Sequence, residues 1–277
     1  LAVPADPADP LARAWRKLPS NPQVNGTFDD PSTAWRTAAG EWRFVGNSRI
    51  NATAADQSPI FGAADFAGPW ARIGLTNLPW GECPSLYPLP AFSPGTAPPR
   101  GPVPTHVHKR SRQTHNCSGD CSGDVVSLGA WADGGPGAAG SWAAVPGIPA
   151  GPVVIDQGNR YASKDFADGK HGGRRINFGW IHVNPGGGAA RSGGQSLPRV
   201  QTYHPELKRL VHAPLPELAA LRLGAPLATV PGAALRPGAG HPLGPWPGAV
   251  GRGNTSEVYA TFELPAPAVA GRVGVRV

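Results

Sequence analysis

Glycine and proline recur along the whole chain and set the strongest limit on its fold. The 277 residues include 38 glycines and 34 prolines. Because each of these residues weakens or breaks an α-helix, few windows of a dozen residues could hold one. Nine tryptophans and eight phenylalanines argue against disorder, since a disordered tract seldom carries so many large apolar rings. The chain is therefore expected to be all-β and dense in turns.

Tryptophan beside a turn marks two predicted β-hairpins. One spans residues 34–45 with a turn at Ala39-Gly40, and the second spans 130–145 around a glycine-rich turn. This recurrence favours repeated sheets, as in a β-propeller, over one continuous sandwich. Further strands are predicted at 153–155, 161–163, 175–183 and 197–203, and a short helical segment at 216–223.

The segments between these elements suggest how the chain is organised. Residues 1–20 are predicted as an extended lead-in and 94–124 as an irregular insert. Residues 224–255 carry many glycines and prolines and almost no charge, which is typical of a linker. From Ser256 the sequence alternates between polar and apolar residues, which predicts a strand that opens a new domain.

Charge and cysteine content exclude several classes of partner. The formal net charge is +7, but the basic residues are scattered apart from Lys109, Arg110 and Arg112, so no nucleic-acid partner is expected. No apolar run approaches the ~20 residues needed for a membrane span.

Three cysteines allow one disulfide with its pairing open: Cys83, Cys117 and Cys121. The nearby histidines match no zinc spacing, so no metal or cofactor is expected: His106, His108 and His115.

Four Asn-x-Ser/Thr sequons indicate the compartment. They are candidate glycosylation sites at Asn25, Asn51, Asn116 and Asn254. The chain has no methionine and starts at Leu1, which is expected of a processed product or a fragment. Together these features predict a glycoprotein of the secretory pathway, either extracellular (in the cell wall) or vacuolar.

Two carboxylates lie in contexts that suit acid/base chemistry. Asp30 lies between Phe28-Asp29 and Pro31, and Glu82 lies between Trp80-Gly81 and Cys83-Pro84. Aromatic and proline neighbours can hold a carboxyl in a rigid, apolar setting, which acid/base catalysis exploits. From spacing alone, a turn residue at Asp30 and an exposed carboxylate at Glu82 remain open alternatives.

Five segments in the same order resemble glycoside hydrolase family 32, the invertases and fructosyltransferases. Residues 30–36 resemble the Arg-Asp-Pro segment of that family, and Glu82-Cys83-Pro84 resembles its Glu-Cys-Pro motif. Residues 156–166 are similar to its Asp-x-Gly-x-x-Tyr-Ala-Ser-Lys segment, and residues 174–181 and 195–199 follow in the family's order. The resemblance runs from about residue 20 to 223.

The resemblance implies a fold and a chemistry. It implies a five-bladed β-propeller, with the first blade not represented and blades two to five in residues 1–223. A linker at 224–255 and the opening strand of a β-sandwich at 256–277 would follow. It further implies cleavage of β-fructofuranosyl linkages in sucrose or fructan by a retaining two-carboxylate mechanism. Glu82 would be the acid/base and Asp30 the transition-state stabiliser, while Asp156 and Trp80 would bind substrate.

The chain also departs from the family pattern. Asp29 stands where the family has arginine, Ser85 replaces an aspartate, and Asn159 stands where sucrose-splitting members often carry lysine. The family's nucleophile lies in an Asn-Asp-Pro-Asn-Gly segment, which this sequence does not contain. The chain is therefore expected to be catalytically incomplete as given. A fructosyltransferase and a non-catalytic sugar-binding relative are the alternatives.

Overall fold

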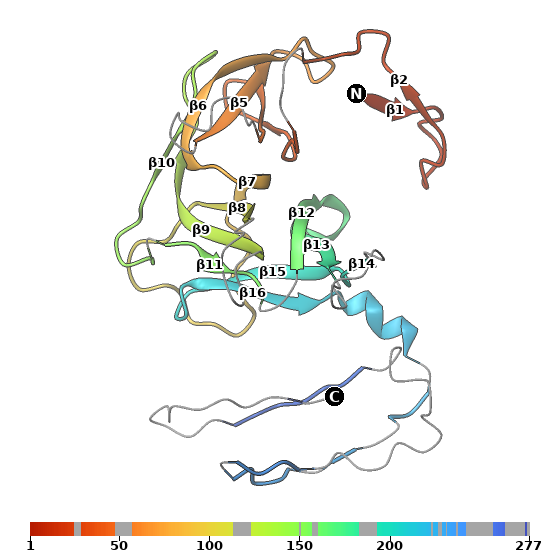
Figure 1. Cartoon of the computed structure of the whole chain (residues 1–277), viewed down its shortest axis with the longest axis vertical. Helices are drawn as coiled ribbons and strands as arrows, with labels where there is room; N and C mark the ends of the chain where they lie inside the picture. Colours follow the sequence, from red (N-terminus) through yellow and green to blue (C-terminus); the bar gives the residue numbers. More distant parts are fainter. Residues whose placement is uncertain are drawn as a thin grey trace, which may run out of the picture. The chain divides into compact units, whose positions relative to one another are not determined.

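The computed structural model describes most of the first 222 residues and short stretches beyond them: 1–24, 29–47, 57–112, 123–149, 151–156, 160–182, 193–222, 224–226, 229–230, 232–236, 238–241, 257–263 and 275. The chain divides into two units, Leu1–Ala219 and Ala220–Val277. The first unit is built of strands (Figure 1) and contains the short 3-10 helix η1 (Gly169–His171). A second 3-10 helix, η2 (Pro216–Leu221), begins in the first unit and ends in the second. Within the described residues no helix is long and apolar enough to cross a membrane. The all-β prediction is confirmed, and η2 occupies the predicted helical segment.

The first sheet is a four-stranded antiparallel meander. Its strands are β3 (Trp35–Arg36), β4 (Trp42–Val45), β5 (Gln57–Ala63) and β6 (Ala71–Pro79), each paired with the next. The first predicted tryptophan hairpin is β3–β4, with Trp35 opposite Arg43 and Arg36 opposite Trp42. Gly40 in its turn has a φ of +86°, which glycine adopts without steric cost.

The second sheet contains β7 (Glu82–Pro88), β8 (His106–Arg112), β9 (Gly123–Ala132) and β10 (Ser141–Ala143), with β11 (Val153–Val154) along β9. The second predicted hairpin is β9–β10, with Trp142 opposite Trp131. It is the last hairpin of its sheet, whereas β3–β4 is the first of its own. The repeating unit is therefore the sheet, and the two tryptophan hairpins are not equivalent parts of it.

The prediction that residues 94–124 form an irregular insert is wrong, because β8 lies inside this segment. The sequence of β8 shows no apolar alternation, and its Lys109, Arg110 and Ser111 are all buried. The Lys109 ammonium donates to Ser111 on the same strand and to the Ser163 carbonyl on β12, so this strand is buried without being apolar. A pattern based on hydrophobic side chains cannot find such a strand.

The third sheet has the path β12 (Arg160–Asp168), β13 (Arg174–His182), β15 (Arg199–His204) and β16 (Arg209–Pro214), with β14 (Gly193–Gln195) beside β13. These strands confirm the ones predicted from residue 161 to 203. At the start of the chain, β1 (Ala2–Pro4) and β2 (Trp15–Lys17) pair as a small hairpin, which corrects the predicted extended lead-in. The described residues 257–263 are not part of a strand, so the opening strand of a sandwich stays a prediction.

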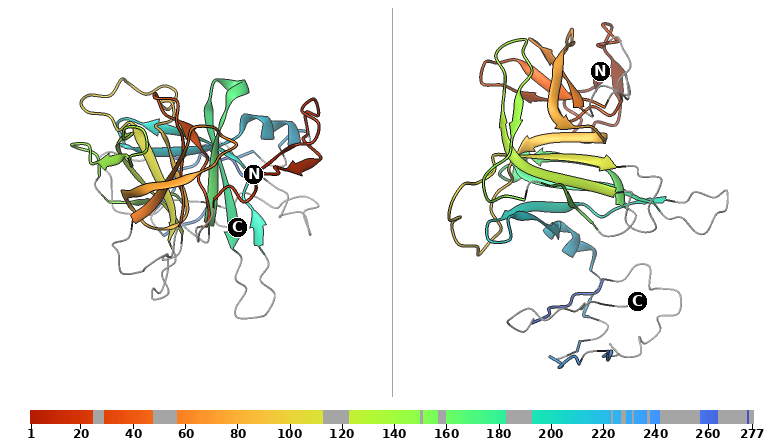
Figure 2. Two further views of the ribbon diagram at one scale, coloured as in Figure 1. Left: turned by 90° about the horizontal axis from the view of Figure 1, so that it is seen from above. Right: turned by 60° about the vertical axis from the view of Figure 1, so that its left-hand side comes forward.

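The second sheet packs against the other two through opposite faces of its first strand. On β7, Leu86 packs with Val45 and Ile60 of the first sheet. Its neighbour Tyr87 packs with Tyr203 and Leu210 of the third sheet. Successive side chains on a strand point to opposite faces, so β7 serves both cores. The three sheets follow one another in chain order (Figure 2), as blades do in a propeller, and the count of four blades within 1–223 stays a prediction.

Candidate functional site

The predicted acid/base residue meets a tyrosine from the next sheet. Glu82 is the first residue of β7 and is half-buried, and Tyr161 lies near the start of β12. The Tyr161 hydroxyl donates a hydrogen bond to Glu82 Oε2 over 2.6 Å. In Figure 1 these strands lie side by side in the first unit. Tyr161 belongs to the family-like segment 156–166, but the sequence assigns it no role.

Asp30 lies next to Cys83, the residue that follows Glu82. The backbone N–H of Cys83 donates to Asp30 Oδ2 over 3.1 Å. Asp30 itself is half-buried in the loop that precedes β3. Two carboxylates that are 52 positions apart in the sequence numbering are thus joined through one backbone amide. The two residues predicted to be catalytic are brought together.

The backbone at this point adopts an uncommon conformation three times. Asp30, Cys83 and Ala162 have φ angles of 52°, 47° and 52°. Each such residue costs on the order of 1–3 kcal/mol, and such residues cluster at functional sites. Cys83 and Ala162 also lie in irregularities of the strand register, between Glu82 and Ser85 and between Tyr161 and Lys164. A bulge of this kind redirects the side chains beside it.

A lysine links the loop that carries Asp30 to the strand that carries Glu82. Lys164 Nζ donates to the carbonyl oxygens of Pro31, at 2.9 Å, and Pro84, at 3.4 Å. Burial lowers the pKa of the Lys164 ammonium, while Cys83 and Asp30 act in the opposite direction. Lys164 therefore supplies a positive charge near Asp30. The nearby Asp29, where the family has arginine, pairs through its backbone with Asn47.

The predicted substrate-binding residues lie at different places. Asp156 follows β11 and is held in an ion pair by Arg199, with 2.7 Å between Oδ2 and Nη1. Trp80 is half-buried in the turn that joins β6 to β7, directly before Gly81 and Glu82. Trp80 is thus adjacent to the carboxylate site along the chain, while Asp156 is engaged by the third sheet. Their roles in substrate binding stay predictions.

An open groove lies next to Tyr161 on the third sheet. Trp180 is the strand partner of Tyr161 and is 41% exposed. The groove combines this indole with glycines and polar groups: Ala162, Lys164, Phe178, Gly179, Trp180, Gly193, Gly194 and Gln195. An aromatic face beside polar side chains suits a sugar ring, which has apolar C–H faces and a polar rim.

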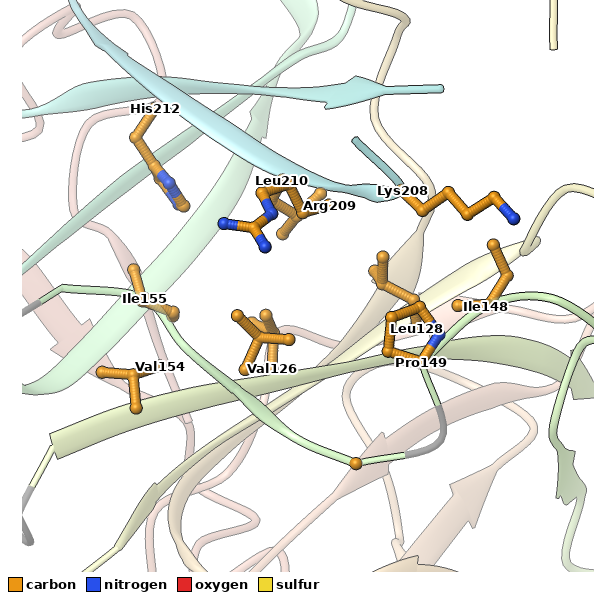
Figure 3. A pocket seen from close by; sticks show the side chains of 12 residues that line it. Val126, Leu128, Ile148, Pro149, Val154, Ile155, Lys208, Arg209, Leu210 and His212 are labelled. Atoms are coloured by element: carbon orange, nitrogen blue, oxygen red, sulfur yellow. The ribbon is translucent and has the colours of Figure 1, made fainter. Parts of the chain in front are cut away.

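A second cavity lies away from the carboxylates, between the second and third sheets (Figure 3). Apolar side chains of β9 and β11 face Lys208, Arg209 and His212 across it. Burial lowers the pKa of His212 to about 4, and the charges of Arg160 and Arg199 contribute. Glu82, Asp30 and Tyr161 do not line this cavity.

Several predicted positions lie outside the described residues. The four sequon asparagines are among them: Asn25, Asn51, Asn116 and Asn254. Cys117 and Cys121 lie there too, so the disulfide pairing stays open. The described Cys83 is a free, half-buried thiol, and burial raises its pKa.

Several known proteins are similar in sequence to this chain. The chain is 29% identical over 251 residues to "Acid beta-fructofuranosidase 4, vacuolar" of Arabidopsis thaliana, a match that covers 80% of this chain and 35% of that protein. It is 31% identical over 245 residues to "Beta-fructofuranosidase, insoluble isoenzyme 2" of Oryza sativa subsp. indica, covering 80% and 39%. The chain thus spans well under half the length of these relatives. No family model matches it.

Solved structures support the fold. The fructan 1-exohydrolase IIa of Cichorium intybus superposes with a TM-score of 0.57 and 24% identity, covering 80% of this chain and 43% of that one. The exo-inulinase of Aspergillus awamori superposes with a TM-score of 0.50 and 18% identity, covering 72% and 40%. At these identities the likeness concerns the fold, and it confirms the β-propeller class.

Proposed function

The chain is a relative of the plant β-fructofuranosidases of glycoside hydrolase family 32, and on that premise we propose that its site takes a β-fructofuranosyl unit of sucrose or a fructan. The arrangement of Glu82, Tyr161 and Asp30 carries the proposal. It offers one carboxyl held by a phenol, and a second carboxylate fixed by a backbone amide.

Glu82 is the proposed acid/base. In a retaining mechanism this group protonates the leaving oxygen and later removes a proton from water. The Tyr161 hydrogen bond to Oε2 holds the Glu82 carboxyl group that is proposed to protonate the glycosidic oxygen. Proton transfer of this kind requires a carboxyl in a fixed position within hydrogen-bond reach of the substrate.

Asp30 is the proposed stabiliser of the transition state. Its Oδ2 accepts from the Cys83 amide, so its Oδ1 is the oxygen proposed to accept from fructose hydroxyls. Lys164 holds the adjacent carbonyls of Pro31 and Pro84 and thereby fixes the loop in front of the sugar. The groove with Trp180 and Gln195 is proposed to hold the remainder of the substrate.

A second candidate function is non-catalytic binding of fructosides. Asp29 replaces the arginine of the family, and the sequence contains no Asn-Asp-Pro-Asn-Gly segment to provide an attacking carboxylate. Loss of a nucleophile costs other hydrolases on the order of 10⁴ to 10⁶ in rate. The 277-residue chain is therefore proposed to bind fructosides but to release little fructose. We further propose that the protein is located in the cell wall or the vacuole.

One comparison tests these proposals. The 277-residue chain is assayed for fructose release from sucrose and 1-kestose, beside a chimera that carries ahead of Leu1 the Asn-Asp-Pro-Asn-Gly blade of a plant relative. Activity of the chimera, lost in Glu82→Gln and kept in the exposed control Glu206→Gln, supports the enzyme. If the Glu82→Gln chimera keeps a tenth or more of the fructose release, Glu82 is not the acid/base.

A measurement of sugar binding separates the two candidate functions. Calorimetric titration of sucrose and 1-kestose into the chain and the chimera measures affinity without turnover. Binding by both with turnover by neither favours the non-catalytic relative. Absence of both binding and turnover contradicts the proposed function.

A further inference from the structure

A buried lysine contacts the backbone just after Glu82 and just after Tyr161. Lys109 is on β8, and its side chain is 1% exposed. Its ammonium donates to the carbonyl oxygen of Cys83 at 3.1 Å and to that of Ser163 at 2.6 Å. Cys83 follows Glu82 on β7, and Ser163 lies two residues after Tyr161 on β12. One cation therefore bridges the two strands that carry the pair.

Two further buried side chains complete the cluster. Asp124 on β9 lies 3.2 Å from the Lys109 ammonium and accepts from the Ser163 amide at 3.0 Å. Ser111 donates to Asp124 at 2.5 Å and accepts from the Ala162 amide at 3.2 Å. Together these three side chains hydrogen-bond the backbone amides of Ala162 and Ser163 and the carbonyl of Ser163, in the bulge after Tyr161.

We propose that Lys109, with Asp124 and Ser111, is a positioning residue that fixes the separation of Glu82 and Tyr161 by holding the two bulges that follow them. The inference rests on the proposed function for its role in the reaction, while the positioning itself is a property of the fold. None of the three side chains contacts substrate, since all are buried.

The chemistry of the cluster suits this role better than a general contribution to stability. A buried ion pair contributes little net stability, because desolvation offsets much of the attraction. Burial lowers the pKa of the Lys109 ammonium, and Asp124 opposes this effect. What the ammonium provides is several donors in one place, aimed at carbonyls from two strands. The left-handed backbone of Cys83 and Ala162 needs such an external restraint, since it is disfavoured locally.

Fluorine NMR of the 277-residue chain tests the inference without turnover. The chain has four tyrosines, so incorporation of 3-fluorotyrosine gives four signals, and Tyr161→Phe identifies that of Tyr161. The Glu82→Gln variant then shows in which direction the Tyr161 signal moves when the carboxylate that accepts its hydrogen bond is lost. Lys109→Met is then expected to move the Tyr161 signal in the same direction while those of Tyr87 and Tyr203 stay in place. Arg43→Met, which removes a different cation that is 1% exposed, is the matched control and leaves the Tyr161 signal unchanged.

A folded Lys109→Met chain with the native Tyr161 signal would overturn the inference. If this variant does not fold, Lys109→Met with Asp124→Asn removes both charges, and Ser111→Ala removes only the acceptor of the Ala162 amide. Movement of the Tyr161 signal alone in either of these variants supports the inference, and a native signal in both contradicts it. The signal is observed whether or not the chain cleaves fructosides, so failure of the proposed function is a separate result.

Discussion

Trp35 and Trp131 donate their indole N–H groups to the same carboxylate oxygen, Oδ1 of Asp133, over 3.2 and 2.9 Å. The two rings meet edge to face with their centroids 6.4 Å apart. Trp35 is on β3 of the first sheet and Trp131 on β9 of the second. One acceptor thus joins the two tryptophan hairpins that the sequence marks out, across the boundary between sheets.

Replacement of Asp133 by alanine is expected to destabilise the first unit. It leaves two indole donors without their acceptor, and Trp131 is only 8% exposed. An unsatisfied buried donor costs about 1–3 kcal/mol. We expect a loss in this range in the free energy of unfolding, measured by urea denaturation followed by tryptophan fluorescence. Asp133→Asn keeps an acceptor and should recover most of the loss; an alanine variant of native stability would contradict the shared role.

Acidification is expected to act on His108. The side chain is fully buried, and neither ring nitrogen has a hydrogen-bond partner in the described part of the chain. Burial lowers the pKa of His108 to about 3 from 6.5, helped by Arg110 and Lys109. Below pH 6.5 the unfolded chain therefore binds a proton here that the folded chain does not. Stability falls with pH in this window, by up to about 1.4 kcal/mol per pH unit.

The difference between two proteins isolates this effect. Denaturation of the native chain and of His108→Leu is compared between pH 6.5 and pH 4.5. The leucine variant should gain about 2–3 kcal/mol relative to the native chain as the pH falls, because it has no ring to protonate. A difference that is constant over this range would show that His108 takes up its proton in the folded state.

Tyr161→Phe is expected to reduce turnover. It removes one hydrogen bond to the Glu82 carboxyl, and hydrogen bonds to charged groups contribute about 1.5–3 kcal/mol. If this energy acts on the transition state, kcat for sucrose in the chimera falls roughly tenfold to a hundredfold. Tyr203→Phe, a matched change at a tyrosine in the core between the second and third sheets, should leave kcat within about twofold. Equal effects of the two substitutions would contradict a role for Tyr161 beside Glu82.

Glycosylation is expected at one or more of the four sequons. Expression in a eukaryotic secretory host should add mass at Asn25, Asn51, Asn116 or Asn254, and an endoglycosidase should remove it. Mass spectrometry of peptides identifies the sites. A secreted chain with all four asparagines unmodified would count against the proposed compartment.

Local sequence signals predicted the parts of this fold that depend on short-range chemistry. The tryptophan hairpins around Gly40 and Trp131 were recognisable because turn residues separate β-forming ones. The expectation that Glu82 and Asp30 serve one site followed from resemblance to a family, since no local pattern connects two positions so far apart in the sequence. Tyr161 lay in a recognised segment, but its contact with Glu82 depends on how two sheets pack.

The failure at β8 has a different physical cause. Lys109 and Arg110 belong to a short basic cluster inside the predicted irregular insert, and charged residues are rarely buried without partners. The Lys109 ammonium has partners on β7, β9 and β12, which no window around residue 109 includes. A buried polar strand is visible only when the tertiary structure supplies the groups that satisfy it.

The bulge at Cys83 separates two regions of one strand. Regular pairing of β7 with β8 resumes at Ser85 and continues through Leu86 and Tyr87, which anchor the two cores. A change of length or residue type at Glu82 or Cys83 is therefore confined to the irregular segment before Ser85. It does not change which face of the sheet Leu86 and Tyr87 point to. Residues at the start of β7 can therefore differ between relatives while Leu86 and Tyr87 keep their places in the two cores. In this way proteins with different site chemistry can share one fold.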